Sequence, residues 1–225
     1  KDLSDGLDRI ELGFKRRRKM TDEERRRTAY HEAGHVIVAY FLHPTDDVFK
    51  ASIVSRRDAL GVVLHQPREE LFTWSRDRIL GSIKVALGGF VAEKLKFDST
   101  SDGVAADFRN AMTQAHMMVW RLGMGSNGFV GDYEVLLSTS QFRGAGTSDR
   151  ISDRTKERLN DETHLILKRC TQDVEELLKK EDALLNRFAN ALLDKEELEY
   201  DDIEAIFAEF GKQRGLPPPP SSPSA

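Results

Sequence analysis

The 225 residues are enough for one sizeable domain and leave little room for two. Hydrophobic residues make up 39% of the chain and charged residues 32%, a balance typical of a helix-rich folded protein rather than a disordered one. The formal net charge of −4 argues against a general attraction to nucleic acid or anionic lipid. The single cysteine, Cys170, excludes an internal disulfide and favours a reducing, cytoplasm-like compartment.

The first predicted element is a short amphipathic segment over residues 1–20, which ends in a run of basic residues. We interpret it as a connector from an upstream module. At Thr21 a capping box follows, in which the threonine and Glu24 can satisfy each other's backbone groups. Apolar residues then recur at helical spacing until Pro44, so the sequence predicts a helix over residues 22–42.

The pattern changes to β-branched, alternating segments between residues 48 and 66, which predicts two short strands. Helical periodicity returns over 79–95, 104–122 and 152–178, and two more helices are expected near 182–193 and 200–210. A glycine-rich stretch over 123–148 is predicted to be a long loop. We assign residues 21–212 to one domain and 213–225, which are rich in proline and serine, to a disordered tail.

The motif that indicates a metal-binding catalytic site is His31-Glu32-Ala33-Gly34-His35, an H-E-x-x-H sequence inside the helix predicted over residues 22–42. Residues four apart lie on one helical face, so the two imidazoles can bind one metal ion. Glu32 points to the side of the pair, where it can accept a proton from a zinc-bound water that attacks a peptide carbonyl. Glycine at position 34 weakens a helix, which suggests that another part of the protein approaches closely there.

A catalytic zinc ion needs a third protein ligand, and two acids qualify. Glu93 and Asp107 each flank an apolar stripe of a predicted helix, where an unpaired carboxylate would be costly. Either acid can instead form a salt bridge or a contact at a helix end. Residue spacing alone does not show whether Glu93 or Asp107 is the third ligand.

The segment from Thr28 to Ala39 closely resembles the metal-binding helix of the FtsH family of AAA proteases. Further similar segments follow in the family's order and extend the resemblance over about residues 5–210: 59–61, 86–93, 99–108, 120–125 and 193–198. The 99–108 segment is similar to the stretch that supplies an aspartate as the third zinc ligand. The resemblance therefore implies that His31, His35 and Asp107 bind Zn²⁺, with Glu32 as the general base.

The resemblance also implies the rest of the function. It predicts a mainly α, helical zinc metallopeptidase domain with a small β element, an α+β fold. The expected activity is hydrolysis of unfolded or damaged polypeptides by a homo-hexamer, in which an upstream ATPase module binds ATP and a further segment anchors the protein to a membrane. The chain itself contains no G-x-x-x-x-G-K-[ST] phosphate loop.

Some positions depart from the family pattern, and two other classes of function remain open. Ala106 stands where the family usually has asparagine, and Lys94 where an acid is usual. A scaffold without turnover is one alternative, although Glu32 argues against it. A module that binds nucleic acid or a membrane surface through the basic runs 15–19 and 25–27 is the other; we expect those runs to be solvated or to form protein contacts, and we expect no nucleic-acid partner.

The second strand, near Leu60 to Leu64, is expected at the rim of the zinc cleft as an exposed sheet edge, where an unfolded substrate can add as another strand. Gly61 would then either admit the substrate backbone or mark a bulge. We expect Trp74 to be a packing residue and His43 and His65 to be surface or core residues, not metal ligands.

Overall fold

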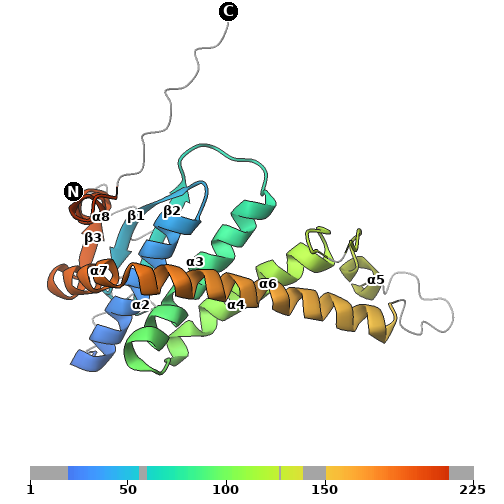
Figure 1. Ribbon diagram of the computed structural model, residues 1–225, viewed down its shortest axis with the longest axis horizontal. Coiled ribbons are helices and arrows are strands. Elements are labelled where there is room, and N and C mark those ends of the chain that lie inside the picture. The colour runs from blue at the N-terminus through green and yellow to red at the C-terminus, as the bar shows by residue number, and fades with distance from the viewer. Residues whose placement is uncertain (1–19, 56–59, 127, 139–150, 213–225) are drawn as a thin grey trace, which may run out of the picture.

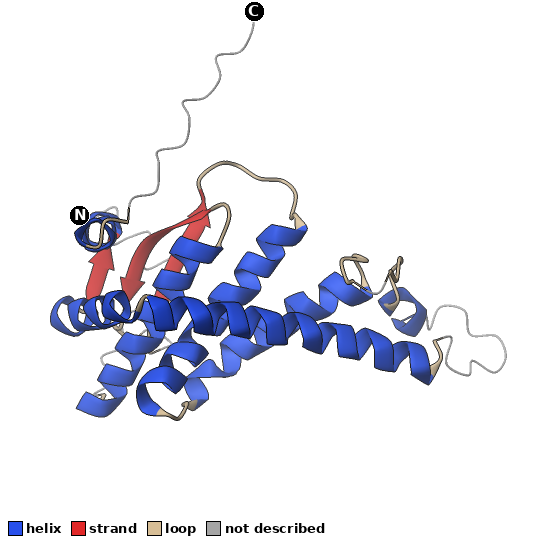
Figure 2. Cartoon of the chain, in the orientation of Figure 1, coloured by secondary structure: helices blue, strands red, loops and turns tan. Residues whose placement is uncertain are grey.

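The computed structural model describes residues 20–55, 60–126, 128–138 and 151–212. The predicted connector before residue 20 and the predicted tail after residue 212 lie outside these ranges. Helices dominate and a small sheet lies at one end (Figures 1 and 2), so the predicted mainly α fold with a small β element is confirmed.

The helices agree closely with the periodicity of the sequence. They are α2 (Asp22–Leu42), α3 (Arg76–Phe97), α4 (Ala105–Trp120), α5 (Glu134–Ser138), α6 (Asp153–Lys180), α7 (Asp182–Lys195) and α8 (Tyr200–Glu209), with a 3-10 turn η1 (Asp102–Val104) before α4. Helix α5 was not predicted; it interrupts the expected loop over 123–148, of which residues 127 and 139–148 lie outside the described part.

The sheet has the strand order β2-β1-β3 and is antiparallel throughout. Its strands are β1 (Asp46–Ser52), β2 (Val62–Pro67) and β3 (Glu197–Glu199). The sequence did not predict β3, because three residues are too few to show an alternating pattern. Within this sheet β2 pairs only with β1, so its other edge is free among the described strands.

Helix α2 forms the centre of the domain. The capping box at Thr21 is present, with the Thr21 N–H donating to Glu24 at 2.7 Å. From Thr28 to Tyr40 every residue of α2 is buried, because α3, α7 and β1 pack around the helix. A helix that is buried on all sides needs a reason to contain charged residues, and α2 holds three ionisable side chains of the H-E-x-x-H motif.

Glycines let α2 and α3 cross at very close range. A Cβ atom at Gly34 would lie 2.4 Å from the Gly88 carbonyl oxygen, and one at Gly88 would lie 2.8 Å from the Gly34 carbonyl oxygen. A Cβ at Gly89 would fall 2.4 Å from the His31 ring. The predicted close approach at Gly34 is therefore the backbone of α3, and it places the motif directly against that helix.

A second apolar cluster joins α3, α4 and α6 and contains Cys170, which is 2% exposed. Burial raises the pKa of this thiol to about 11, so it behaves as a small apolar residue.

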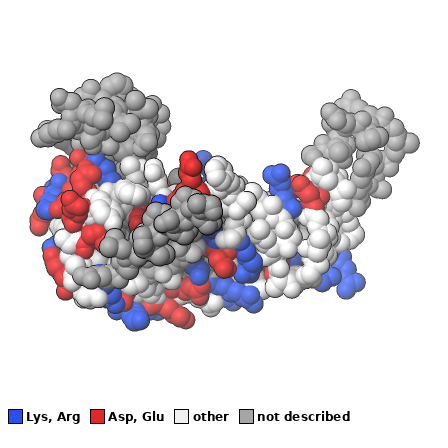
Figure 3. Space-filling view, turned by 90° about the horizontal axis from the view of Figure 1, so that it is seen from above, with Lys and Arg blue, Asp and Glu red and all other residues white. Residues whose placement is uncertain are grey.

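On the face shown in Figure 3, positive and negative side chains are interspersed. Two arginines of the basic run 25–27 have internal partners, since Arg25 pairs with Glu196 and Arg27 with Glu93. No described helix has the length and apolar character that crossing a membrane requires.

Candidate metal centre

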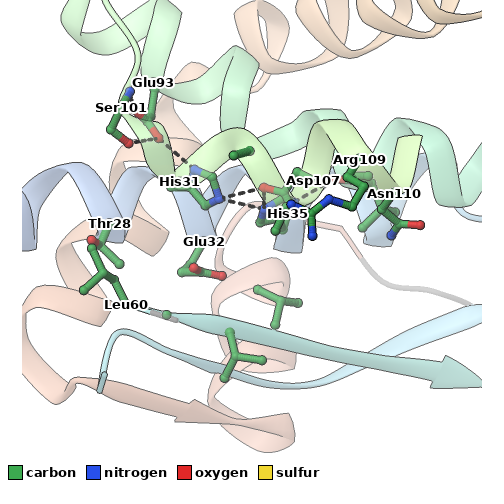
Figure 4. A pocket seen from close by; sticks show the side chains of 18 of the residues that line it. Thr28, His31, Glu32, His35, Leu60, Glu93, Ser101, Asp107, Arg109 and Asn110 are labelled. Carbon is green, nitrogen blue, oxygen red and sulfur yellow. Dashed lines mark hydrogen bonds and ion pairs between the residues drawn. The ribbon is translucent and has the colours of Figure 1, made fainter. Parts of the chain in front are cut away.

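Three electron-pair donors converge where α2 faces the start of α4 (Figure 4). His31 Nε2 lies 3.0 Å from His35 Nε2 and 3.1 Å from Asp107 Oδ2. His35 Nε2 lies 3.3 Å from the same carboxylate oxygen. The two imidazoles are one helical turn apart on α2, and Asp107 is in the first turn of α4. Thus the structure brings together the three residues that the sequence resemblance selects.

The opposite ring nitrogen of each histidine is fixed by a hydrogen bond. His35 Nδ1 lies 2.7 Å from the Val85 carbonyl oxygen. Because a carbonyl can only accept, Nδ1 must carry the hydrogen, and the neutral ring presents its lone pair at Nε2. His31 Nδ1 lies 2.8 Å from Glu93 Oε1, an arrangement that orients the second ring in the same way.

Glu93 is an orienting carboxylate and does not point at the converging atoms. Its two oxygens accept hydrogen bonds from His31, from Arg27 and from the Ser101 N–H and hydroxyl. Burial raises its pKa, but the bonds to His31 and Ser101 outweigh that effect and lower it. A carboxylate with these partners is held ionised and fixed in place, as expected for a residue that positions a histidine ligand.

The donor set fits a zinc ion. Two imidazole nitrogens and one carboxylate oxygen are typical zinc ligands, and tetrahedral ligands at about 2.0–2.1 Å from zinc lie roughly 3.3 Å apart. The observed separations of 3.0 to 3.3 Å are close to that value. With both Nδ1 atoms donating elsewhere, three lone pairs face one another, and only a cation or a proton can relieve their repulsion.

The pKa values of His31 and Asp107 also favour a positive charge between these side chains. Burial lowers the pKa of His31, yet its hydrogen bonds to Asp107 and Glu93 raise it to about 10. Burial raises the pKa of Asp107, but His31 and His35 hold it well below its usual value. Without a metal, a proton on His31 supplies the positive charge, so a metal ion has to displace it.

Glu32 lies beside the cluster and is 5% exposed. Burial raises the pKa of this carboxyl, while the charges of His31 and His35 oppose the rise. Gly61, just before β2, touches the carboxylate: a Cβ there would lie 2.3 Å from Glu32 Oε1. A side chain at position 61 would therefore displace the expected base, and this contact explains the glycine better than a bulge does.

A cleft of about 1020 Å³ runs past these residues. One side is the segment Leu60–Val63, which leads into and forms the start of β2, and another is the first half of α4 with Asp107 and Asn110 (Figure 4). The predicted edge strand thus borders the same space as the converging ligands. An extended chain fits a cleft with one free strand edge along its wall.

Comparison with known proteins decides the family. A sequence model of Peptidase family M41 matches residues 18–206. The chain belongs to peptidase family M41. It is 35% identical to the ATP-dependent zinc metalloprotease FtsH 3 of Conexibacter woesei over 99% of the chain and 30% of that relative. It is 34% identical to the ATP-dependent zinc metalloprotease FtsH of Thermus thermophilus over 92% of the chain and 33% of that relative.

The M41 chain spans about a third of the length of these curated relatives. The resemblance to the FtsH family is confirmed, and the expected enzyme class, a zinc metalloprotease, agrees with the names of the relatives.

Sequence reasoning missed two features of the M41 cleft. His65 on β2 lines it and bonds through Nδ1 to Asp46 at 2.8 Å, and Asp46 also contacts the buried His43. The two histidines are far apart in sequence, and only the pairing of β1 with β2 brings them together. The interpretation of Trp74 as a packing residue was wrong: the side chain is 54% exposed and lines the cleft.

Proposed function

We propose that this M41 domain is a zinc-dependent endopeptidase that hydrolyses peptide bonds of unfolded polypeptides. The observation that carries the proposal is the convergence of His31 Nε2, His35 Nε2 and Asp107 Oδ2 beside a buried carboxylate, Glu32. These three residues would hold the zinc ion. When bound, the ion supplies Lewis acidity, which lowers the pKa of water and polarises a peptide carbonyl.

The protein's own residues have separate roles in the reaction. Glu32 takes the proton of the attacking water at its carboxylate, and burial raises the pKa of this carboxyl, which makes it a stronger base than an exposed glutamate. Glu93 keeps the His31 ring in the required tautomer, and the Val85 carbonyl does the same for His35. The edge of β2 offers backbone groups to an extended substrate.

Several wider properties are part of the same proposal. The names of the relatives include ATP dependence, while this chain contains no phosphate-loop motif. We propose that ATP is bound by an ATPase module outside these residues, and that the complete protein is a membrane-anchored homo-hexamer which passes unfolded chains to this cleft. A scaffold that lacks turnover is the alternative, and an assay of proteolysis on the zinc-loaded protein distinguishes the two.

Removal of zinc tests the proposed function. A chelator is expected to abolish cleavage of an unfolded protein such as casein, and one equivalent of zinc per chain is expected to restore it.

The affinity for zinc is expected to depend on pH. Zinc displaces the proton of His31, whose pKa is about 10, so the affinity of the protein for zinc should rise with pH below that value, by about tenfold per pH unit for one proton. Calorimetric titration in buffers of different ionisation enthalpy measures the released proton. Full cleavage by metal-free protein would contradict the proposal.

Proline substitution tests the role of the β2 edge. Adjacent residues of a strand direct their N–H groups to opposite sides, so one of Val62 and Val63 donates toward β1 and the other toward the cleft. We expect Val62→Pro to remove the donor on the cleft side and to impair cleavage of unfolded protein, with zinc content and helicity unchanged. Val63→Pro is then the matched control, which loses a bond to β1 and lowers the melting temperature.

If Val63→Pro impairs cleavage and Val62→Pro lowers the melting temperature instead, the N–H of Val63 is the one that faces the cleft, and strand addition still holds. If both variants fold and cleave unfolded protein at the normal rate, strand addition at this edge is wrong.

A further inference from the structure

Arg109 is a cation of the cleft that has no acidic partner among the described residues. It lines the cleft from α4 and is exposed. The other arginine that lines the cleft, Arg27, is neutralised by Glu93 at 3.2 Å. Asp107 is only two residues from Arg109, but its carboxylate contacts the two histidines of the metal centre instead. The guanidinium of Arg109 is therefore available to a ligand in the cleft.

Helix geometry places this guanidinium at the mouth of the cleft. At about 100° per residue, Arg109 leaves α4 about 200° around the helix from Asp107. Helical side chains lean toward the N-terminus of their helix, so the long Arg109 side chain returns toward the level of Asp107. In Figure 4 it extends from α4 toward His35, which lines the same cleft. Thus Asp107 serves the floor of the cleft and Arg109 its mouth.

The position of Arg109 along the cleft restricts what it can contact. Arg109 lies only about 3 Å beyond Asp107 on α4, at 1.5 Å per residue. An extended chain advances about 3.3 Å per residue, so the guanidinium meets substrate residues within about two positions of the bond that is cleaved. Side chains of an extended chain alternate between two faces, and those that point to the mouth come within its reach.

The charge on the other side of the metal centre is negative. Asp102 in η1 lines the cleft and is exposed, and no described cation pairs with it. In the chain Asp102 precedes Asp107 by five residues, whereas Arg109 follows Asp107. An acidic side chain of a bound chain is therefore repelled near Asp102 and attracted near Arg109.

A guanidinium without a counter-ion selects a carboxylate. It stays charged at every pH at which the protein is folded, and its planar N–H groups match the two oxygens of a carboxylate. A chain that fills the cleft also excludes water from the pair, which strengthens their attraction. An amide of the same shape lacks the charge, and a lysine in its place is repelled.

We propose that Arg109 forms a subsite that selects an aspartate or glutamate of the substrate, within about two residues of the scissile bond. The guanidinium donates N–H groups to the carboxylate at the mouth of the cleft. This inference rests on the proposed peptidase function, which assigns the cleft to a polypeptide. It adds a charge preference that strand addition at β2 lacks, because strand addition uses backbone groups alone.

Peptides of matched sequence test the subsite on the zinc-loaded protein. Each of the two positions on either side of the scissile bond carries aspartate, asparagine or lysine in turn; mass spectrometry identifies the cleaved bond, and kcat/KM is measured. At one of these positions aspartate is expected to exceed asparagine by about three- to fivefold, the worth of a well-formed exposed ion pair. Lysine should be the poorest there, and added salt should reduce the differences.

Substitutions of Arg109 assign the preference to its charge. Arg109→Gln should remove the advantage of aspartate over asparagine. Arg109→Glu should reverse the ranking, so that lysine exceeds aspartate. Arg169→Glu is the matched control, since Arg169 is an exposed arginine of α6 that does not line the cleft; its ranking should stay as in the parent protein.

The parent ranking in Arg109→Glu would overturn the subsite. A change of oligomeric state of Arg109→Glu in sedimentation would overturn it too, because Arg109 would then contact a second copy. Cleavage without charge preference at any tested position removes the subsite alone.

Binding measurements separate the subsite from the peptidase function. Fluorescence anisotropy of labelled peptides on zinc-loaded Glu32→Gln reports the preference without turnover. If the parent protein cleaves no peptide while this variant still binds the aspartate peptide more tightly than the asparagine peptide, the peptidase function fails and the subsite stands. Absence of both cleavage and charge-dependent binding overturns both.

Discussion

Glu32→Gln is expected to lower the turnover of peptide hydrolysis by about 10²- to 10⁴-fold while zinc binding stays intact. The amide has almost the same shape as the carboxylate and fits the same contact with Gly61. It has no basic oxygen at neutral pH, so it cannot accept the proton of the attacking water. The measurements are kcat on an unfolded substrate, and zinc content by elemental analysis.

Glu23→Gln is the matched control for this experiment. Glu23 is on the same helix but its side chain is 81% exposed, so the same chemical change should leave turnover and zinc content unaltered. Normal turnover by Glu32→Gln would overturn its role as general base. Loss of zinc from Glu32→Gln would instead show that Glu32 contributes to binding the ion.

The parts of the site that were predictable from sequence are those that lie within one helix. A capping box at Thr21 and a proline at position 44 delimit α2, and the fixed spacing of His31 and His35 brings their rings together whatever the rest of the fold does. The glycine at 34 correctly indicated a close neighbour. Local rules of helix geometry suffice for each of these inferences.

The remaining parts depend on how elements pack, which spacing cannot reveal. Glu93 and Asp107 both flank apolar stripes. Only the packing of α3 and α4 around the motif shows that Glu93 lies at Nδ1 of His31 while Asp107 lies at Nε2. Likewise, nothing local links Gly61 to Glu32, since a loop and a strand bring them into contact. For Trp74 the sequence offered only its apolar character, which does not separate a core residue from one at the rim of a cleft.

Asp107→Asn is expected to weaken zinc binding strongly, by at least the roughly 10- to 100-fold that loss of an outer partner of a ligand costs. The amide lacks the negative charge that stabilises the ion. It also cannot hold the proton on His31 as the carboxylate does, so the pKa of His31 should fall toward its ordinary value. Competition with a chromophoric chelator gives the zinc affinity, and proteolysis should fall in proportion to zinc occupancy.

Glu93→Gln is the informative comparison, because both acids contact His31 but at different nitrogens. The amide oxygen that this substitution introduces can still accept from His31 Nδ1, so zinc binding should decline less than in Asp107→Asn. The added loss of the Arg27 ion pair should appear as reduced thermal stability. If Asp107→Asn keeps full zinc occupancy while Glu93→Gln loses it, the third ligand is Glu93. If both variants lose zinc affinity equally and severely, the orientation of the His31 ring by Glu93 matters as much as the Asp107 ligand itself.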